Sequence, residues 1–396
     1  MGILVENSLF SLRLSLTILR FTGFWPPKGL TRKKLLLYNC YGFFWFMFIV
    51  GMFLITEVGD LFIIWGNLPL MTGIAFVLFT NLAHTTKFIN IVARRNAIIK
   101  IISNSDEDLR SEKSIRGRNI IESCNREAQR QQLFYYVLTL FTCVGWAGSA
   151  EKDKLPLRAW YPYDTTKSPA YELMYMHQVF SIFSAAVLNV SKDTLVTTLI
   201  AQCRCRLRLV GLSLRTLKNN KRFTEVSFYS KILLHALSTL PLKHVRKCVI
   251  RHQKILETVT LLQNTFSEPT FAQFTVSLVI ICATGFQIVT PTRNYFRLIS
   301  MGAYLLIMMF QVFIYCYQGN QLSSESEEVA RAAYDIPWYA YSMRMRKFVL
   351  IVMTRCNRVA KLTAGGFTTL SLNSFTGIIK MSYSFFTLLQ QVTESK

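Results

Sequence analysis

Long runs of apolar residues, separated by polar segments, dominate the chain. A helix that crosses the hydrocarbon core of a bilayer needs about 20 residues. Six runs predict such spans: Leu35–Ile55, Leu68–Val92, Leu133–Ala147, Met174–Thr198, Phe271–Val289 and Leu298–Tyr317. The third run is short, so we expect its helix to begin earlier, within the polar stretch AQRQQ. The pattern predicts an all-α membrane protein.

A seventh apolar segment, Leu370–Val392, is more polar than the others. Its polar residues recur at spacings of four, three and four, which places them along one face of a helix: Lys380, Ser384, Thr387 and Gln391. The opposite face carries large apolar residues: Phe375, Ile379, Phe386 and Leu389. A polar stripe is costly against lipid. It therefore packs against helices of the same chain, or it lines a water-filled pore between several copies.

Basic residues alternate along the chain and predict its orientation. Lys and Arg number six in residues 1–34, nine in 94–131, thirteen in 203–266 and seven in 318–363, and the intervening connections hold far fewer. Since basic loops stay cytosolic during insertion, we expect a cytosolic N-terminus and an extracellular C-terminus. G-protein-coupled receptors have the opposite orientation, and no DRY-like or NPxxY-like motif follows the corresponding spans.

The basic cytosolic segments account for the net charge of +23, so the charge does not indicate a nucleic-acid partner. We also expect these segments to be attracted to anionic membrane lipid. Between the spans, the basic segments show helical periodicity. We therefore expect the fourth and fifth spans to continue as cytosolic helices. Ser324 or Ser326 is expected to cap another helix. The outer loop 150–170 contains prolines and aromatic residues, which favours an ordered cap.

Two other function classes fit the sequence poorly. An enzyme would need a catalytic or metal-ligating motif, but the five histidines show no HExxH spacing and no GxSxG run is present. A transporter would be expected to carry interrupted spans and midplane charges in two related halves. Asp193 beside Lys192 is the clearest charge within a span, and we expect it to pair with a neighbouring residue. No cofactor is predicted.

Four segments resemble the insect odorant receptor family, and together they extend over nearly the whole chain. They are RFTGFWPP at 20–27, LPLRAWYPYDTTKSPAYELMYMHQ at 155–178, GNQLSSESEEVARAAYDIPWY at 319–339 and LTAGGFTTLSLNSFTGIIKMSYSFFTLL at 362–389. The related gustatory receptors end in a TY-hhhh-QF-like motif (h, apolar), whereas this chain ends in SYSFFTLLQQ. That difference favours an odorant-tuning subunit, with a gustatory-type homomeric cation channel as the alternative.

The resemblance implies a ligand-gated, non-selective cation channel that requires no G protein. Four subunits, including the family's co-receptor, would surround one pore in the plasma membrane of an olfactory neuron dendrite. The implied organisation begins with a cytosolic or re-entrant N-terminal segment (1–34), spans 1–4 with the ligand pocket (35–204) and a cytosolic anchor extension (205–266). Spans 5–6 (267–318), a second anchor segment (319–363) and a pore-lining seventh span with an outer tail (364–396) follow.

By motif match, Thr387, Gln390 and Gln391 fall where the family's pore-facing residues are expected. The co-receptor has apolar residues at the positions that match Thr387 and Gln391. Polar side chains stay wetted, so we hypothesise that this subunit does not seal the pore alone. Lys380 lies on the same stripe, and it either snorkels into an inner vestibule or pairs outside the pore.

The resemblance also implies an odorant pocket in the outer half of the second, third, fourth and sixth spans. Small volatile ligands bind mainly by apolar burial. Our candidate contacts are Phe76, Phe79, Thr80, Phe141, Trp146, Met176, Phe180, Phe183, Met301, Tyr304 and Met308. For any single aromatic residue here, packing is favoured over ligand contact, and Tyr304 is the preferred polar contact. His84 and His177 are interpreted as hydrogen-bonded structural residues, with orientation of a polar odorant as the alternative.

Overall fold

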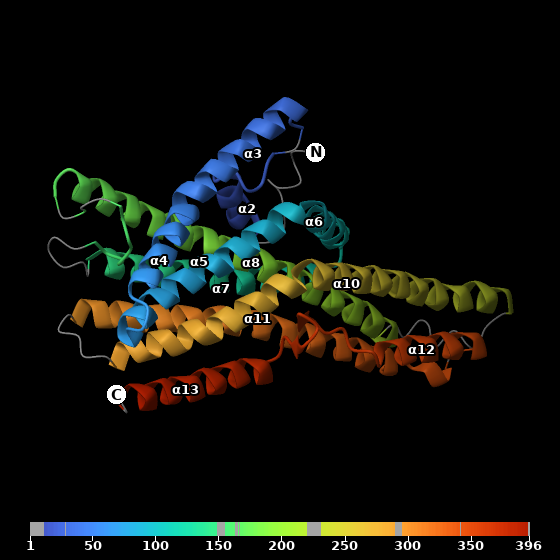
Figure 1. Cartoon of the computed structure of the whole chain (residues 1–396). Helices are drawn as coiled ribbons and strands as arrows, with labels where there is room; N and C mark the ends of the chain where they lie inside the picture. The colour runs from blue at the N-terminus through green and yellow to red at the C-terminus, as the bar shows by residue number, and fades with distance from the viewer. Residues whose placement is uncertain are drawn as a thin grey trace.

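The computed structural model describes residues 12–27, 29–148, 155–162, 165, 167–219, 231–289, 295–340 and 342–394, and these are almost entirely helical (Figure 1). The helices are α2 (Leu12–Phe21), α3 (Arg32–Phe46), α4 (Met52–Ile63), α5 (Leu68–Ala93), α6 (Arg95–Arg110), α7 (Ile115–Gly148), α8 (Ala170–Asn219), α10 (Lys231–Val289), α11 (Tyr295–Tyr334), α12 (Met343–Cys356) and α13 (Leu372–Glu394). The predicted all-α membrane fold is confirmed.

The long helices lie roughly alongside one another, with α6 near the middle of the bundle and α12 at one end (Figure 1). Among the described residues, four stretches are long and apolar enough to cross a membrane by themselves: Arg32–Ile63, Ala170–Thr216, Leu242–Val289 and Tyr295–Tyr334. The other three predicted spans are α5, α7 and α13, whose sequences contain more polar residues. In α5 many of these polar residues are buried, including Asn81, His84 and Lys87. Low mean hydropathy there reflects an inward-facing polar surface.

The first span is interrupted by one π-helical turn. Met47–Gly51 forms η1 between α3 and α4, with continuous helical backbone on both sides. A π turn shifts the helical register by one residue and is frequent at functional sites. Ile49 and Val50 in this turn are buried against the core.

Three helices are much longer than a bilayer requires, since α8, α10 and α11 contain 50, 59 and 40 residues. At 1.5 Å per residue, even α11 is about 60 Å long. The third span begins before Leu133, as expected, but not within AQRQQ, because α7 starts at Ile115 and continues through that stretch. Beyond the spans, ion pairs join these helices. Arg204 of α8 donates to Glu127 of α7 at 2.7 Å, and Arg208 pairs with Glu325 of α11.

The expectation of a separate helix capped by Ser324 or Ser326 was wrong. Helix α11 continues without interruption through both residues. The Ser326 hydroxyl instead accepts a hydrogen bond from the backbone N–H of Ala360 at 3.0 Å. This serine therefore fastens the segment before the last helix to α11.

A short hairpin sets the direction of α13. Strands β1 (Thr363–Ala364) and β2 (Thr368–Thr369) pair antiparallel through a turn containing Gly365 and Gly366. Gly365 has φ +60°, and a Cβ there would lie 2.8 Å from Cγ of Phe271. Both the backbone conformation and the close contact with α10 therefore require glycine. The sequence LTAGGFTT thus fixes where the last helix begins.

Candidate ligand-binding site

A cavity of about 130 Å³ lies within the bundle. Most of its wall comes from α5, α7, α8 and α11, with further residues from η1, α4 and the loop before α8. The lining residues are Ile49, Phe53, Phe76, Val77, Thr80, Asn81, His84, Tyr135, Thr139, Thr142, Cys143, Trp146, Leu157, Ser181, Ile182, Ala185, Ala186, Asn189, Val190, Tyr304, Ile307 and Met308. An engineered cavity of about 150 Å³ in another protein binds benzene, so this space suits a molecule with one ring.

Three aromatic side chains, Phe76, Trp146 and Tyr304, form what we call the aromatic end of the cavity. The ring of Phe76 lies 5.6 Å from that of Trp146 and 5.5 Å from that of Tyr304. Such distances between ring centroids are favourable for aromatic pairs. The aromatic end therefore offers a preformed apolar surface.

The Tyr304 hydroxyl is not free to serve a ligand as a donor. It lies 2.5 Å from the Thr80 hydroxyl, which itself lies 2.6 Å from the carbonyl oxygen of Phe76. A hydroxyl has one proton. Since Thr80 donates its proton to Phe76, Tyr304 must donate to Thr80. This bond fixes the Tyr304 ring across the α5–α11 contact.

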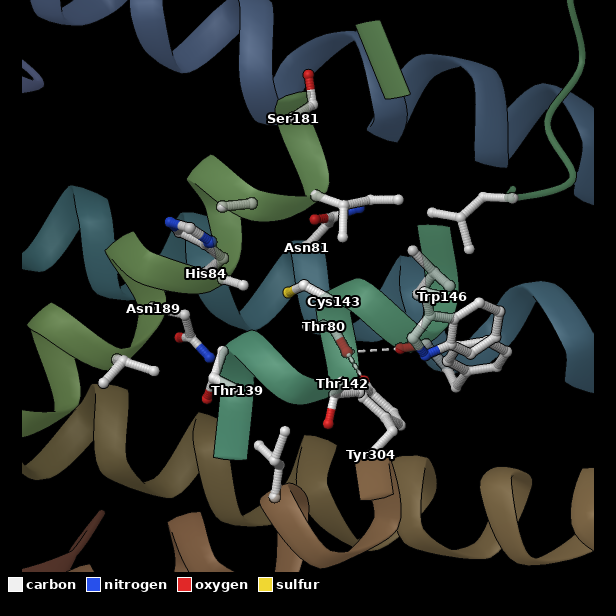
Figure 2. A pocket seen from close by; sticks show the side chains of 18 of the residues that line it. Thr80, Asn81, His84, Thr139, Thr142, Cys143, Trp146, Ser181, Asn189 and Tyr304 are labelled. Atoms are coloured by element: carbon white, nitrogen blue, oxygen red, sulfur yellow. Dashed lines mark hydrogen bonds between the residues drawn. The ribbon is translucent and has the colours of Figure 1, made fainter. Parts of the chain in front are cut away.

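Across the cavity, three polar side chains form what we call the polar end: His84 of α5, Thr139 of α7 and Asn189 of α8. Figure 2 shows them on one side of the pocket, with Trp146 on the other. Asn189 accepts a hydrogen bond from the Lys87 ammonium at 3.0 Å through Oδ1. The polar end thus borders a buried charge.

That charge belongs to a cluster centred on Asp193, whose side chain is fully buried. Its carboxylate accepts hydrogen bonds from Lys87 at 2.6 Å, Tyr315 at 2.9 Å and Tyr135 at 3.1 Å, and also from Gln311. Four helices, α5, α7, α8 and α11, meet at this one carboxylate. The predicted pairing of Asp193 is observed, and its ionic partner is Lys87 of α5. A charge inside a membrane protein is tolerated when it is paired and hydrogen-bonded in this way.

The loop before α8 contributes to the wall of the cavity through Leu157. Gln178 accepts from the Leu157 backbone N–H at 3.0 Å and donates to the Leu157 carbonyl at 3.1 Å. Arg158 pairs with Asp60 of α4 at 2.9 Å, and the Trp160 backbone N–H donates to Thr56 at 3.3 Å. In the part of this loop that the structure describes, the expected ordered cap is present, and Leu157 faces the cavity.

Five of the eleven predicted contacts line the cavity: Phe76, Thr80, Trp146, Tyr304 and Met308. The other six lie outside its lining. Met301 is buried in the main core, Phe79 and Phe183 are half-buried, and Phe141, Met176 and Phe180 are exposed. The spacing of Met176, Phe180 and Phe183 places them on one helical face, but the face of α8 that meets the cavity carries Ser181, Ala185 and Asn189.

Sequence reasoning missed most of the small and polar lining residues. Asn81, Thr139, Ser181 and Asn189 line the cavity although none was a predicted contact. A usable signal was present, because each is a polar residue inside an apolar run. His177, by contrast, lies outside the lining and contacts the carbonyl oxygen of Phe48 at 3.1 Å.

Helix α13 packs on α10 and α11 through one face only (Figure 1). Phe375, Ile378 and Ile379 pack against the main core, and the Ser382 hydroxyl is buried and donates to Ile378 at 2.9 Å. The predicted polar stripe lies elsewhere on the helix. Its members Lys380, Ser384 and Gln391 are exposed, while Thr387 and Gln390 are half-buried. Within a single chain, the stripe is therefore not used for internal packing.

The arrangement suits binding more than catalysis. Among the described residues, no group of His, Cys, Asp and Glu side chains is placed to hold a metal ion. The cavity combines an apolar wall with a few oriented polar atoms, as small-molecule sites generally do.

Known proteins resemble this chain over nearly its whole length. The family model described as 7tm Odorant receptor matches residues 67–383. Odorant receptor Or1 of Anopheles gambiae is 24% identical over 96% of this chain and 94% of its own, and Odorant receptor 94a of Drosophila melanogaster is 22% identical over 98% and 99%. The insect olfactory receptor OR5 of Machilis hrabei, solved in complex with eugenol, superposes with a TM-score of 0.80 at 17% identity, over 96% of this chain and 97% of that one.

These relatives are receptors of one family, with the same seven-helix membrane fold and no enzymatic activity among their descriptions. The family match extends from the start of α5 into α13. The chain is therefore a multi-pass membrane protein, and it belongs to the insect odorant receptor family.

Proposed function

We propose that this chain is the odorant-binding subunit of a heteromeric, odorant-gated, non-selective cation channel. A small volatile ligand occupies the cavity between α5, α7, α8 and α11, and α13 contributes to a pore shared with other subunits. The observation that carries the proposal is the mostly apolar cavity of about 130 Å³ within the helix bundle. The structural relative OR5 was solved with eugenol, a one-ring molecule, which is consistent with a ligand of this size.

The proposed pore follows from the exposed stripe on α13. Thr387, Gln390 and Gln391 are our pore residues, near the end of the helix that we place outside the cell. Three further chains, among them the family's co-receptor, would bury the stripe around water. The basic helical extensions of α8, α10 and α11 would then lie in the cytosol as the anchor, in the plasma membrane of an olfactory neuron dendrite.

Helix α11 connects the cavity to α13. Tyr304, Ile307 and Met308 of α11 line the cavity, and Phe313, less than two turns further along, packs edge-on against Phe375 of α13 at 5.6 Å. A ligand opens the pore only if it binds the open arrangement better than the closed one. Each tenfold shift in the opening equilibrium requires about 1.4 kcal/mol of differential binding.

Whole-cell currents test the proposal. We expect volatile compounds to evoke cation currents in cells that express this chain together with the co-receptor, and not in cells that express either alone. Currents from this chain alone, driven by sugars or bitter compounds, would favour the gustatory-type homomeric channel. An odorant response that requires G-protein signalling would contradict the proposal.

The polar pore residues lead to a separate expectation about closure. If the co-receptor supplies most of the seal, the double variant Thr387→Val/Gln391→Leu should lower the resting leak, because apolar side chains exclude water from a constriction. Patch-clamp recordings without odorant measure this leak. Unchanged leak together with unchanged odorant-evoked current would contradict the assignment of Thr387 and Gln391 to the pore.

A further inference from the structure

The two ends of the cavity differ in their unmet hydrogen-bonding capacity. At the aromatic end, Tyr304 and Thr80 satisfy each other. At the polar end, Nε2 of His84 and Oγ1 of Thr139 are buried and have no hydrogen-bond partner within the described chain. These two residues are only 2% and 5% exposed. Buried polar atoms in native proteins are nearly always paired, so a molecule in the cavity is expected to complete this pair.

Asn189 adds a third group with a defined role. Its Oδ1 atom accepts the hydrogen bond from Lys87, which orients the amide. Its amide nitrogen donates no hydrogen bond to another described residue, and an amide NH₂ can only donate. Asn189 lines the cavity. The polar end therefore offers one amide donor, one hydroxyl and one imidazole nitrogen.

The Asp193 cluster holds these three groups in position. His84 lies three residues from Lys87 on α5, Thr139 lies four residues from Tyr135 on α7, and Asn189 lies four residues from Asp193 on α8. Residues three or four apart lie one above the other on a helix. Lys87, Tyr135 and Asp193 are themselves joined by hydrogen bonds. The polar end is thus a second layer stacked on a fixed ionic layer.

We propose that the polar end selects odorants that carry a single hydroxyl or carbonyl oxygen on an apolar body of one-ring size. This inference rests on the proposed function, and it names the ligand class. A ligand oxygen accepts hydrogen bonds from Asn189 and Thr139, and a ligand hydroxyl also donates to Nε2 of His84. The apolar body lies against Phe76 and Trp146. Thr139 and Trp146 are seven residues apart on α7, or roughly 10 Å, which fits one ring plus a short chain.

The same geometry disfavours two related ligand classes. A hydrocarbon of the same shape would leave the three polar groups without partners. A protonated amine at the polar end would be buried without a counter-charge, because the Asp193 carboxylate is already paired with Lys87, and an unpaired buried charge is costly.

A panel of matched volatiles tests the inference in cells that express this chain and the co-receptor. Each set in the panel shares one carbon skeleton, as in 2-phenylethanol, acetophenone, ethylbenzene and phenethylamine. We expect the alcohol or the ketone to act at a concentration at least tenfold lower than the hydrocarbon, with the amine weakest. Equal potency of hydrocarbon and oxygen-bearing compound would overturn the inference.

The variant Thr139→Val removes one hydroxyl with little change of volume. We expect it to reduce the potency ratio between alcohol and hydrocarbon roughly fivefold, and His84→Leu/Thr139→Val to reduce it further. Thr86→Val is the matched control, because Thr86 lies outside the cavity lining and already donates to the Leu82 carbonyl at 3.0 Å. It should leave the ratio within twofold of the wild type.

The outcomes separate this inference from the proposed function. If Thr139→Val and the double variant leave the potency ratio between alcohol and hydrocarbon unchanged, the inference is overturned. The proposed odorant receptor function would still stand. A wild-type chain that reaches the cell surface with the co-receptor, yet responds to no volatile in the panel, would contradict the proposed function itself.

Discussion

Polar residues inside the predicted spans fall into two regions that use them in opposite ways. Around Asp193, polar side chains from α5, α7, α8 and α11 are buried and bonded to one another. On α13, the stripe through Lys380, Ser384 and Gln391 is exposed, and the Ser384 hydroxyl donates to the Lys380 carbonyl of its own helix at 3.1 Å. The first region completes its hydrogen bonds within one chain, whereas the second leaves its side chains for water or for other subunits.

The difference shows that polarity within a span does not reveal its purpose by itself. Both regions lower the hydropathy of their helices, and neither α5 nor α13 is apolar enough to stand out as a span by composition. The two regions differ in how their polar side chains meet the neighbouring helices. Helix α5 packs against α4, α6 and α10 with Asn81, His84 and Lys87 buried, while α13 lies at the edge of the bundle (Figure 1).

Removing the carboxylate from the buried region should have the largest effect. Asp193→Leu leaves the Lys87 ammonium buried without its counter-charge, which typically costs about 3–5 kcal/mol. We expect a large loss of folded protein at the cell surface and a lower melting temperature in detergent. Adding Lys87→Met should restore part of that loss, because it removes the unpaired charge.

An exposed ion pair supplies the control for that experiment. Arg126 and Glu122 lie 3.4 Å apart on α7, and both side chains are about two-thirds exposed (68% and 64%). Such a pair contributes under about 1 kcal/mol, so Glu122→Gln should change the melting temperature little. Equal stability of Asp193→Leu and the wild type would mean that the buried cluster does not hold the four helices together.

A smaller effect is expected from two aromatic residues of α7 that sequence reasoning treated alike. Trp146 lines the cavity and is 6% exposed, whereas Phe141 is 59% exposed on the outer surface. Trp146→Leu should raise the half-maximal odorant concentration about tenfold or more, because the ligand loses its largest apolar contact. Phe141→Leu should shift it less than twofold. Equal shifts in the dose–response curves would place the ligand outside this cavity.

Trp146 and Phe141 also show where sequence information ends. Apolar runs locate the spans, because burial in a bilayer demands them. Which face of a helix meets a cavity depends on its neighbours. Residues 141 and 146 are about 140° apart around α7, and nothing local says which side is inward. The predicted ligand contacts were mostly aromatic residues. Small and polar residues such as Ala185 and Asn189 also line the cavity, and their small size leaves space for it.

The buried ion pair was predictable only in part. A charge such as Asp193 within a span requires a partner, but Lys87 is 106 residues away and no short-range pattern joins them. The capping prediction at Ser324 and Ser326 failed for a related reason. Serine can begin a helix or lie within one, and here packing of α11 against α8, α7 and α12 keeps the helix continuous.

The central claim is that the exposed stripe of α13 faces water in an assembled channel. Two serines two residues apart test it directly: Ser384 on the stripe and Ser382, which is buried at 1% exposure. Each would be changed to cysteine in a Cys40→Ser background, because Cys40 is the exposed member of the nine cysteines. Odorant-evoked current is then recorded before and after a charged, membrane-impermeant thiol reagent is applied from outside. We expect the reagent to block current through Ser384→Cys and to spare Ser382→Cys. An inert Ser384→Cys, or modification of it that leaves the current intact, would contradict the account.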